Sequence, residues 1–271
     1  MRTLAHLSDL HFGRVDADLV EPLVDALRRA APHVVVVSGD FTQRAKAREF
    51  RAARAFLDRL PPTQVLVPGN HDVPLYRVWE RFFSPLGKFR RWICADLEPA
   101  WHDDEIAVVG INTARSLAFK GGRINDEQVE ALRKRLAPLP ESVTKIVVTH
   151  HPFDLPDQPD DAELVGRARL AMDAFARCGV DILLAGHFHT SQSGATSERW
   201  PMGGYAALAV QAGTATSTRG RGESNSFNLL RIENRAIDVE RHVWRPAERA
   251  FVRDHVERFR RDGQRWVELP G

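Results

Sequence analysis

Several short apolar runs in this 271-residue sequence end in side chains that could bind metal ions or transfer protons. The most pronounced example is Pro-Gly-Asn-His-Asp at residues 68–72, which follows the apolar run Val65–Val67. Proline and glycine would end a buried strand there, and the glycine permits a tight turn that presents the three polar side chains together. Such a cluster suits metal binding or acid–base chemistry, but Asn and Asp also form ordinary polar turns with their own backbone. The motif alone leaves both interpretations open.

Two earlier apolar runs end in the same way. Asp9 and His11 follow Thr3–Leu7, and in an extended chain residues two apart point to the same side, where a carboxylate oxygen and an imidazole nitrogen could bind one ion. Asp40 follows Val34–Val37, whose unbroken apolar character is typical of a parallel strand covered on both faces. These runs therefore predict carboxylates at strand ends.

The second half of the chain contributes histidines. The predicted strand Val143–Thr149 ends in His150 and His151, and the strand Val180–Leu184 leads into Gly-His-x-His with His187 and His189. Two imidazoles in one turn can each reach a different ion, which makes this the strongest single indication of metal binding.

Helical patterns separate the predicted strands. Apolar residues recur with helical spacing over 17–30, 45–60 and about 164–177, and Asn125 with Gln128 predicts a capped helix that extends to Leu136. Alternation of strands and helices indicates an α/β fold, and the carboxyl ends of parallel strands are where open α/β sheets bind ligands.

Taken in order, the strand ends resemble one known family. They read Asp9-x-His11, Gly39-Asp40, Gly-Asn-His-Asp at 69–72, His150, and Gly-His-x-His at 186–189. This ordered set resembles the calcineurin-like metallophosphoesterase superfamily from Ser8 to His189. Its motifs look most similar to those of bacterial class III cyclic-nucleotide phosphodiesterase-like proteins, although glycerophosphodiesterases share them.

The resemblance implies a four-layer αββα sandwich of two mixed sheets flanked by helices, with a dinuclear metal centre at one edge. Two divalent or mixed-valence ions are expected, drawn from Mn, Fe, Zn or Co, since the ligands are carboxylate, imidazole and amide oxygen without thiolate. The implied ligands of the first ion are Asp9, His11, Asp40 and His189, and those of the second are Asn70, His150, His187 and the shared Asp40.

The resemblance also implies roles beside the ions. His71 would be catalytic, either hydrogen-bonding a phosphoryl oxygen or protonating the leaving group. Asp72 would orient that imidazole or hold the turn, and His151 would support the site without binding an ion.

The implied reaction is hydrolysis of a small-molecule phosphodiester, of the cyclic-nucleotide or glycerophosphodiester type, by a hydroxide that bridges the ions. Alternatives within the superfamily are a phosphomonoesterase, a nuclease and a non-catalytic protein-binding scaffold. The 38 basic and 36 acidic residues leave a formal charge of +2, which gives no general footprint for a nucleic-acid partner.

Composition and the start of the chain suggest where the protein acts. Polar residues interrupt the apolar N-terminal segment, and no run approaches the ~18 apolar residues of a membrane-spanning helix, so we expect no signal peptide, no membrane span and a cytoplasmic location. Cys94 and Cys178 lack the spacing of a paired ligand, which favours two buried reduced thiols.

The remaining segments are predicted less specifically. We divide the chain into a metallophosphoesterase domain over 1–245 and a C-terminal extension over 246–271. Short strands over 194–243 are expected to build a second sheet, followed by a helix over 249–261 and an edge strand over 266–269. Substrate specificity is assigned to the loops 112–124 and 212–226 and to the aromatic insertion 76–104. Three basic residues of the first loop could contact an anionic substrate or could simply be solvated: Arg115, Lys120 and Arg123.

Overall fold

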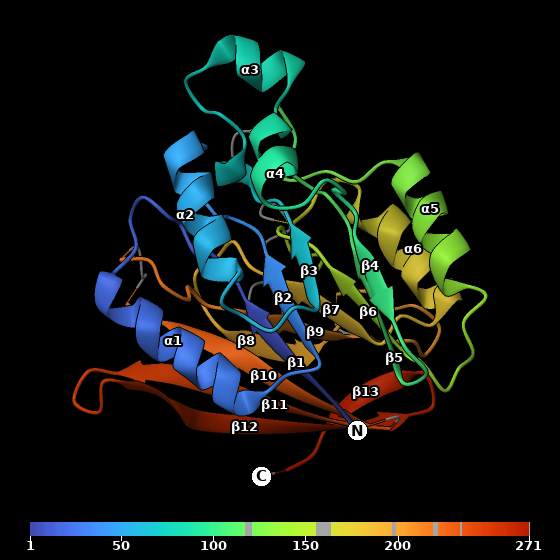
Figure 1. The fold of residues 1–271 in the computed structure, drawn as a ribbon. Coiled ribbons are helices and arrows are strands. Elements are labelled where there is room, and N and C mark those ends of the chain that lie inside the picture. The colour runs from blue at the N-terminus through green and yellow to red at the C-terminus, as the bar shows by residue number, and fades with distance from the viewer. Residues whose placement is uncertain (117–120, 156–163, 197–198, 219–221, 234, 271) are drawn as a thin grey trace.

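The computed structural model describes residues 1–271 except 117–120, 156–163, 197–198, 219–221, 234 and 271. Two mixed β-sheets pack face to face, and helices cover both outer faces (Figure 1). The predicted four-layer αββα sandwich is therefore confirmed.

The first sheet joins the beginning of the chain to its end. The strands β1, β2 and β3 are parallel, and β1 pairs antiparallel with β10, which opens the antiparallel series β10 to β13. Its order is β13-β12-β11-β10-β1-β2-β3. The bounds are β1 Arg2–Leu7, β2 Val34–Ser38, β3 Gln64–Val67, β10 Ser226–Glu233, β11 Ala236–Arg245, β12 Ala250–Asp262 and β13 Arg265–Glu268.

The second sheet has a parallel centre between two antiparallel edge strands. Its order is β4-β5-β6-β7-β9-β8, in which β5, β6, β7 and β9 run parallel. The bounds are β4 Ala100–His102, β5 Ile106–Gly110, β6 Thr144–Val148, β7 Ile182–Ala185, β8 Gln192–Ala195 and β9 Leu208–Gln211.

The valine run of β2 shows why its sequence lacks alternation. Val34 and Val36 point into the core between the sheets, where they join Ile146 and Leu184 from the second sheet. Val35 and Val37 point to the opposite face and pack beneath the outer helices. Because successive strand residues face opposite sides, a strand covered on both sides needs apolar residues at every position.

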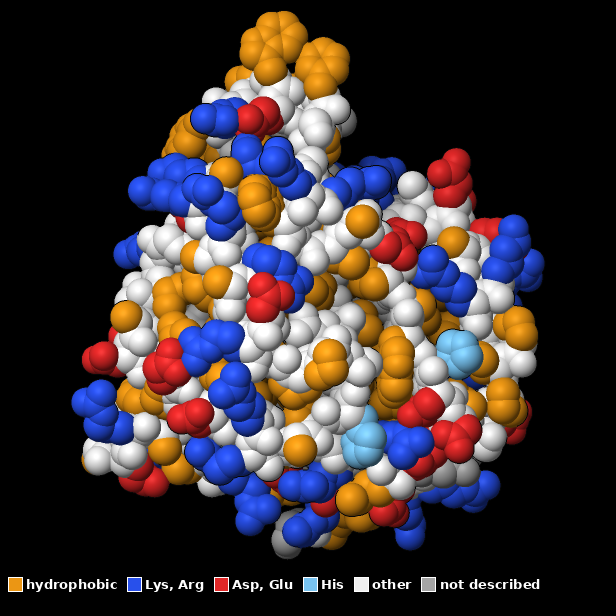
Figure 2. Space-filling view, viewed as in Figure 1, with side chains coloured by type: hydrophobic (Ala, Val, Ile, Leu, Met, Phe, Trp, Pro, Cys, Tyr) orange, Lys and Arg blue, Asp and Glu red, His pale blue; other side chains and the backbone are white. Residues whose placement is uncertain are grey.

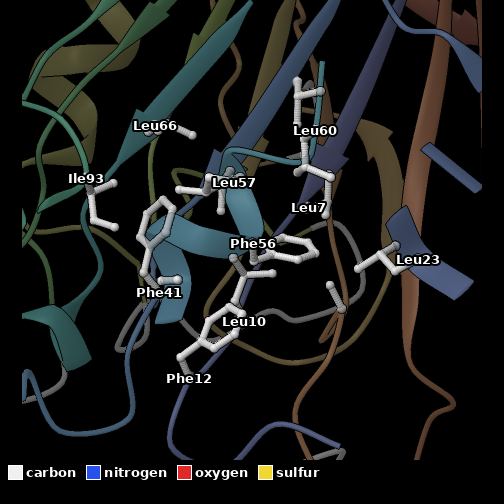
Figure 3. Packing of buried hydrophobic residues seen from close by; sticks show 14 of the residues in the cluster. Leu7, Leu10, Phe12, Leu23, Phe41, Phe56, Leu57, Leu60, Leu66 and Ile93 are labelled. Atoms are coloured by element: carbon white, nitrogen blue, oxygen red, sulfur yellow. The ribbon is translucent and has the colours of Figure 1, made fainter. Parts of the chain in front are cut away.

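Helices fill the two outer layers. Helix α1 (Ala17–Ala30), α2 (Ala47–Leu57) and α4 (Gly87–Trp92) pack on the first sheet, and Figure 3 shows Leu7, Phe41, Phe56 and Leu57 in this core. Helices α5 (Asp126–Leu136) and α6 (Ala168–Cys178) cover the second sheet. The predicted cap of α5 is confirmed, since Asn125 accepts a bond from the Gln128 amide at 2.8 Å and the Gln128 side chain accepts one from the Asn125 amide at 3.1 Å.

The expectation for the last third of the chain is wrong in its topology. The late strands do not form a sheet of their own: β8 and β9 join the second sheet beside β7, whereas β10 to β13 extend the first sheet beside β1. Both sheets therefore combine early and late parts of the chain. Glu198, at the end of one predicted strand, lies outside the described residues.

The predicted helix over 249–261 is also wrong, because this segment is the strand β12, paired with β11 along nearly its whole length. Phe251 and Phe259 are buried, but His255, which a helix would have turned inward, is exposed. Phe251 packs on the outer face of the first sheet, whereas Phe259 packs between the two sheets. The register with β11 shifts between Arg241 and His242, so the helical spacing of these residues does not correspond to one face of the strand. Trp266 lies in the predicted edge strand, β13, at the end of the first sheet.

The structure bears on the predictions about a membrane span and about the two cysteines. No helix in the described ranges is long and apolar enough to cross a membrane. Cys94 and Cys178 are free thiols; Cys178 is buried and Cys94 is only partly buried.

Candidate active site

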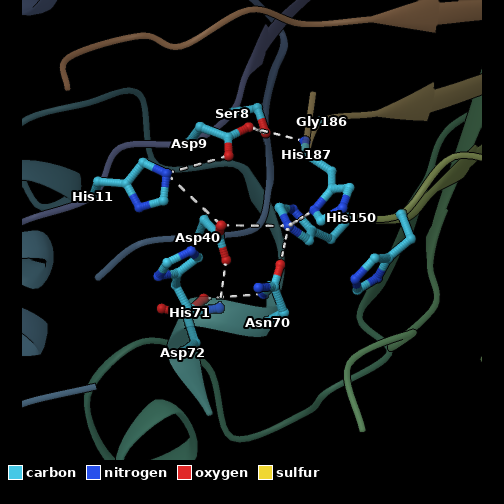
Figure 4. Close-up of polar contacts among 12 residues, drawn as sticks. Ser8, Asp9, His11, Asp40, Asn70, His71, Asp72, His150, Gly186 and His187 are labelled. Carbon is cyan, nitrogen blue, oxygen red and sulfur yellow. Dashed lines mark hydrogen bonds and ion pairs between the residues drawn. The ribbon is translucent and has the colours of Figure 1, made fainter. Parts of the chain in front are cut away.

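Both sheets end at a common edge, and the predicted site residues meet there (Figure 4). The turns after β1, β2 and β3 carry Asp9 with His11, Asp40, and the short 3₁₀ helix η1 (Asn70–Asp72). The turns after β6 and β7 carry His150, His187 and His189. The carboxyl ends of parallel strands in two sheets thus bring together residues up to 180 positions apart.

The first group of donor atoms surrounds one oxygen of Asp9. The Nε2 atoms of His11 and His189 lie 3.4 and 3.8 Å from Asp9 Oδ1. Asp9 Oδ2 is occupied, because it accepts bonds from the Ser8 hydroxyl at 2.6 Å and from the His187 amide at 3.0 Å. One carboxylate oxygen is therefore fixed by the protein and the other points into the group.

The second group surrounds Nε2 of His150. This atom lies 3.0 Å from Asn70 Oδ1, 3.2 Å from His187 Nδ1 and 3.4 Å from Asp40 Oδ2. The other ring nitrogen, Nδ1, donates to the Ser38 carbonyl at 2.8 Å, which fixes the ring and turns Nε2 toward the group.

Asp40 lies between the two groups. Its Oδ2 is 3.8 Å from His11 Nε2 and 3.4 Å from His150 Nε2, whereas Oδ1 accepts a bond from the His71 amide at 2.8 Å. The arrangement repeats that of Asp9: a backbone amide holds one oxygen, and the other faces the donors.

The backbone at these positions is unusual. Five candidate ligands have a left-handed conformation, which is uncommon for residues other than glycine and tends to occur at functional sites. They are Asp9 (φ 54°), His11 (φ 48°), Asp40 (φ 54°), His187 (φ 80°) and His189 (φ 62°).

The donor set fits metal ions. Asp9 Oδ1 and both ring nitrogens of His11 are buried without a hydrogen-bond partner, a costly state for polar atoms unless a ligand satisfies them. Metal–ligand bonds of about 2.0–2.2 Å place neighbouring ligand atoms about 3–3.5 Å apart. The spacing in both groups is close to that range.

The carboxyl and imidazole groups of the site strongly shift one another's pKa values. Burial raises the pKa of the Asp40 carboxyl, but the imidazoles of His150 and His71 outweigh it and hold this pKa well below its usual range. Burial lowers the pKa of His150, yet the Asp40 carboxylate raises it to about 9, whereas burial and His150 together lower the pKa of His187 to about 3. Asp40 is therefore ionised for binding a cation, and His150 would have to give up a proton to bind one.

His71 is held beside the groups. Its Nδ1 lies 3.0 Å from the Gln43 carbonyl, which requires Nδ1 to carry the proton, and its ring packs edge-on against His11 at 4.9 Å. Asp72 performs the other role predicted for it, since it accepts bonds from the amides of Gly69, Phe41 and Thr42 and so ties the η1 turn to the loop after β2. Burial, together with the charge of Asp40, raises the pKa of Asp72 to about 7.

A family model described as calcineurin-like phosphoesterase matches residues 2–191. The chain belongs to this family. Membership places it among the metallophosphoesterase hydrolases, as the ordered motifs predicted.

Individual relatives agree with this placement. The glycerophosphodiester phosphodiesterase GpdQ of Enterobacter lignolyticus is 40% identical over 82 residues, which cover 26% of this chain and 29% of that protein. A dimetal phosphatase from Danio rerio superposes with a TM-score of 0.67 over 94% of this chain and 98% of that chain, at 15% identity. PhoD gives a TM-score of 0.73 over 99% of this chain and 71% of that chain, at 9% identity. The two structures show that the fold is shared.

In this calcineurin-like phosphoesterase, several residues that hold the site were not expected from the sequence. Gln43 and Ser38 act through backbone carbonyls, for which no side-chain pattern exists. The Thr214 hydroxyl contacts His189 Nδ1 from a distant loop, at 2.5 Å. Ser8, adjacent to Asp9, is the one such residue that the motif itself could have indicated.

The basic residues of the loop 112–124 differ from one another. Arg115 bonds the Asn112 carbonyl at 3.1 Å and the Gln128 side chain, so it ties this loop to α5. Arg123 is exposed, and Lys120 lies outside the described residues, as does part of the loop 212–226. His151 is buried, with Nδ1 2.8 Å from the Thr113 hydroxyl, and its ring packs against His150 and His187.

Glycines permit the close approach of the turns. A Cβ atom on Gly69 would lie 2.1 Å from Asp40 Oδ1, and one on Gly186 would lie 2.8 Å from Asp9 Oδ2. Gly69 is therefore needed for space beside the carboxylate, rather than for a left-handed backbone.

Gly69→Ala should displace Asp40 and weaken metal binding by about 10–100-fold, the range typical of changes that misorient ligands. Isothermal titration of the metal-free protein with Mn²⁺ measures this. The matched control is Gly121→Ala, because a Cβ there meets nothing within 4 Å. Equal Mn²⁺ affinities for Gly69→Ala and Gly121→Ala would mean that the position of Asp40 does not govern binding.

Proposed function

We propose that the protein is a dinuclear metal-dependent phosphodiesterase. The observation that carries this proposal is the position of Asp40 Oδ2 between two sets of donor atoms, 3.8 Å from His11 Nε2 and 3.4 Å from His150 Nε2. One carboxylate oxygen that faces both sets would join a pair of ions rather than serve two separate sites. We assign one ion to Asp9, His11, Asp40 and His189, and the other to Asp40, Asn70, His150 and His187.

The pair of ions would supply a hydroxide nucleophile at neutral pH and neutralise charge on the phosphoryl group. The protein orients the metal ligands and supplies a proton donor. Ser8, the His187 amide and the His71 amide hold Asp9 and Asp40, so these two carboxylates are already oriented before the reaction. Because Nδ1 of His71 is committed to the Gln43 carbonyl, Nε2 is the nitrogen that can donate a hydrogen bond or a proton to the substrate.

The preference for a diester is supported by the segment that is similar to GpdQ, a glycerophosphodiester phosphodiesterase. A role for His71 as an acid also suits a diester, since an alkoxide leaves poorly unless it is protonated. Mn, Fe, Zn and Co remain the candidate ions, because carboxylate, imidazole and amide ligands suit all four.

The substrate class is tested by comparing two synthetic esters with the same leaving group. Protein reconstituted with Mn²⁺ should hydrolyse bis(p-nitrophenyl) phosphate with a kcat/KM roughly tenfold or more above that for p-nitrophenyl phosphate, because a diester site lacks groups to bind a second phosphate charge. A preference for the monoester would make the protein a phosphomonoesterase. Cleavage of an oligonucleotide in preference to both would make it a nuclease, and full metal loading without any hydrolysis would indicate a binding scaffold.

A further inference from the structure

Helix α3 (Val78–Phe83) exposes a cluster of large apolar side chains (Figure 2). We call Tyr76, Val78, Trp79, Phe82 and Phe83 the aromatic tip; their exposed fractions range from 52% to 77%. Among the other described residues, Met1 is the one large hydrophobic side chain exposed to this extent, and Val267 and Leu269 are exposed less. Contiguous apolar surface of this kind usually marks a site of interaction.

Specific contacts anchor the aromatic tip and order its side chains. Arg81, on the inner side of α3, is buried and donates to the Pro74 carbonyl at 3.1 Å. On the outer side, the rings of Trp79 and Phe83 stack with centroids 5.6 Å apart and an interplanar angle of 15°. Helix α3 is thus anchored by one face. The helix projects from the body of the molecule (Figure 1), and hydrophobic side chains form its outermost part (Figure 2).

Basic side chains surround the base of the tip. Residues 44–54 and 76–92 contain ten Lys or Arg and two Glu, although the whole chain has a formal charge of only +2. Arg44 lies over the Tyr76 ring at 5.4 Å and joins the two segments. We call the exposed members of this group the basic belt: Arg44, Lys46, Arg48, Arg51, Arg77, Arg90 and Arg91.

We propose that the aromatic tip and the basic belt form a docking surface for an anionic phospholipid bilayer. The rings project beyond the charges, which matches a bilayer, where aromatic side chains enter the interface and basic side chains remain among the phosphates. Stable attachment of a peripheral protein requires two such signals together, and this surface supplies both.

Other partners fit this surface less well. A platform that stacks nucleic-acid bases needs free ring faces, whereas here Trp79 and Phe83 already stack on each other. In a symmetric dimer formed through the tip, the basic belts of the two copies would face each other and repel.

Docking would place the candidate active site beside the bilayer. The tip follows the η1 turn directly, and the Gln43 and Arg44 pair contacts both regions, since Gln43 bonds His71 and Arg44 covers Tyr76. Docking on a bilayer does not require hydrolysis, so vesicle binding and the proposed phosphodiesterase activity can be tested separately.

Co-sedimentation with vesicles tests the proposal. The full chain should bind phosphatidylcholine vesicles that contain phosphatidylglycerol, bind pure phosphatidylcholine vesicles far less, and dissociate from the anionic vesicles as salt is raised. Trp79→Ala with Phe83→Ala should lower the partition coefficient by roughly tenfold or more, and so should Arg90→Glu with Arg91→Glu.

The matched control is Arg258→Glu with Arg260→Glu, which reverses two exposed charges on β12 and should leave binding unchanged. Circular dichroism verifies that each variant is folded. Brominated lipid should quench tryptophan emission of the wild type and quench Trp79→Phe less, which reports insertion directly.

Four results would overturn the proposal. The first is equal binding to zwitterionic and anionic vesicles, and the second is binding that the tip variants leave unchanged. The third is binding of a single-stranded oligonucleotide that competes with vesicles and depends on the tip. The fourth is a dimer in analytical ultracentrifugation that becomes monomeric with Trp79→Ala and Phe83→Ala.

Discussion

Asp40→Ala should lower phosphodiester hydrolysis by about 10³-fold or more, because several kcal/mol of transition-state stabilisation would depend on the ions that we propose this residue joins. Asp40 Oδ2 faces both donor groups, and its loss would leave two cations without a negative charge between them. Initial rates with bis(p-nitrophenyl) phosphate at saturating Mn²⁺ measure the effect.

The control for Asp40→Ala is Asp181→Ala. Asp181 is also a buried carboxylate, but it accepts a bond from the Lys145 amide at 2.9 Å, away from the site. Its replacement should cost stability while leaving the rate per folded, metal-loaded molecule nearly unchanged. Similar losses of rate in both variants would show that the effect arises from loss of a buried carboxylate and not from the metal centre.

His71→Ala should slow hydrolysis by about 10²–10⁴-fold, the usual contribution of a general acid or base, and should leave the metal content nearly unchanged. The ring is positioned by the Gln43 carbonyl and by contact with His11, and the His71 amide, which holds Asp40, survives the substitution. The hydrolysis rate of this variant should therefore fall while its metal content stays the same.

The dependence on leaving group distinguishes the two roles of His71. If it protonates the leaving group, the loss should be larger for an alkyl ester than for a p-nitrophenyl ester; if it binds a phosphoryl oxygen, both losses should be similar and His71→Asn should recover part of the rate. His255→Ala, an exposed histidine on β12, serves as the control. Loss of metal from His71→Ala would make this residue a ligand or a structural support.

The sequence places the candidate site residues at strand ends, and the structure brings these residues together, because each motif is local. Asp9, Asp40 and His187 each follow an apolar run within a few residues, and strand ends in parallel sheets must meet at one edge. The partners that orient these side chains were not predicted. The Gln43 carbonyl and the Thr214 hydroxyl come from other loops, and only the folded chain brings them to His71 and His189.

The pairing of strands that are far apart in the sequence was likewise not predictable from local patterns. Pairing of β1 with β10 joins Arg2 to Ile232, and no local pattern specifies a partner so distant in the chain. In β12, Phe251 and Phe259 have the spacing of one helix face, yet they pack on opposite faces of the first sheet, and pairing with β11 is what makes this segment a strand. Errors therefore occur where pairing across the sheet overrides the local pattern.

The most direct test of the dinuclear centre is the number of ions bound per chain, measured by elemental analysis of desalted, Mn²⁺-saturated protein alongside Asp40→Ala. A pair of ions joined by Asp40 predicts two ions per chain in the active wild type and a joint loss of both in the variant. At most one ion in fully active wild-type protein, or two ions retained by Asp40→Ala, would contradict it.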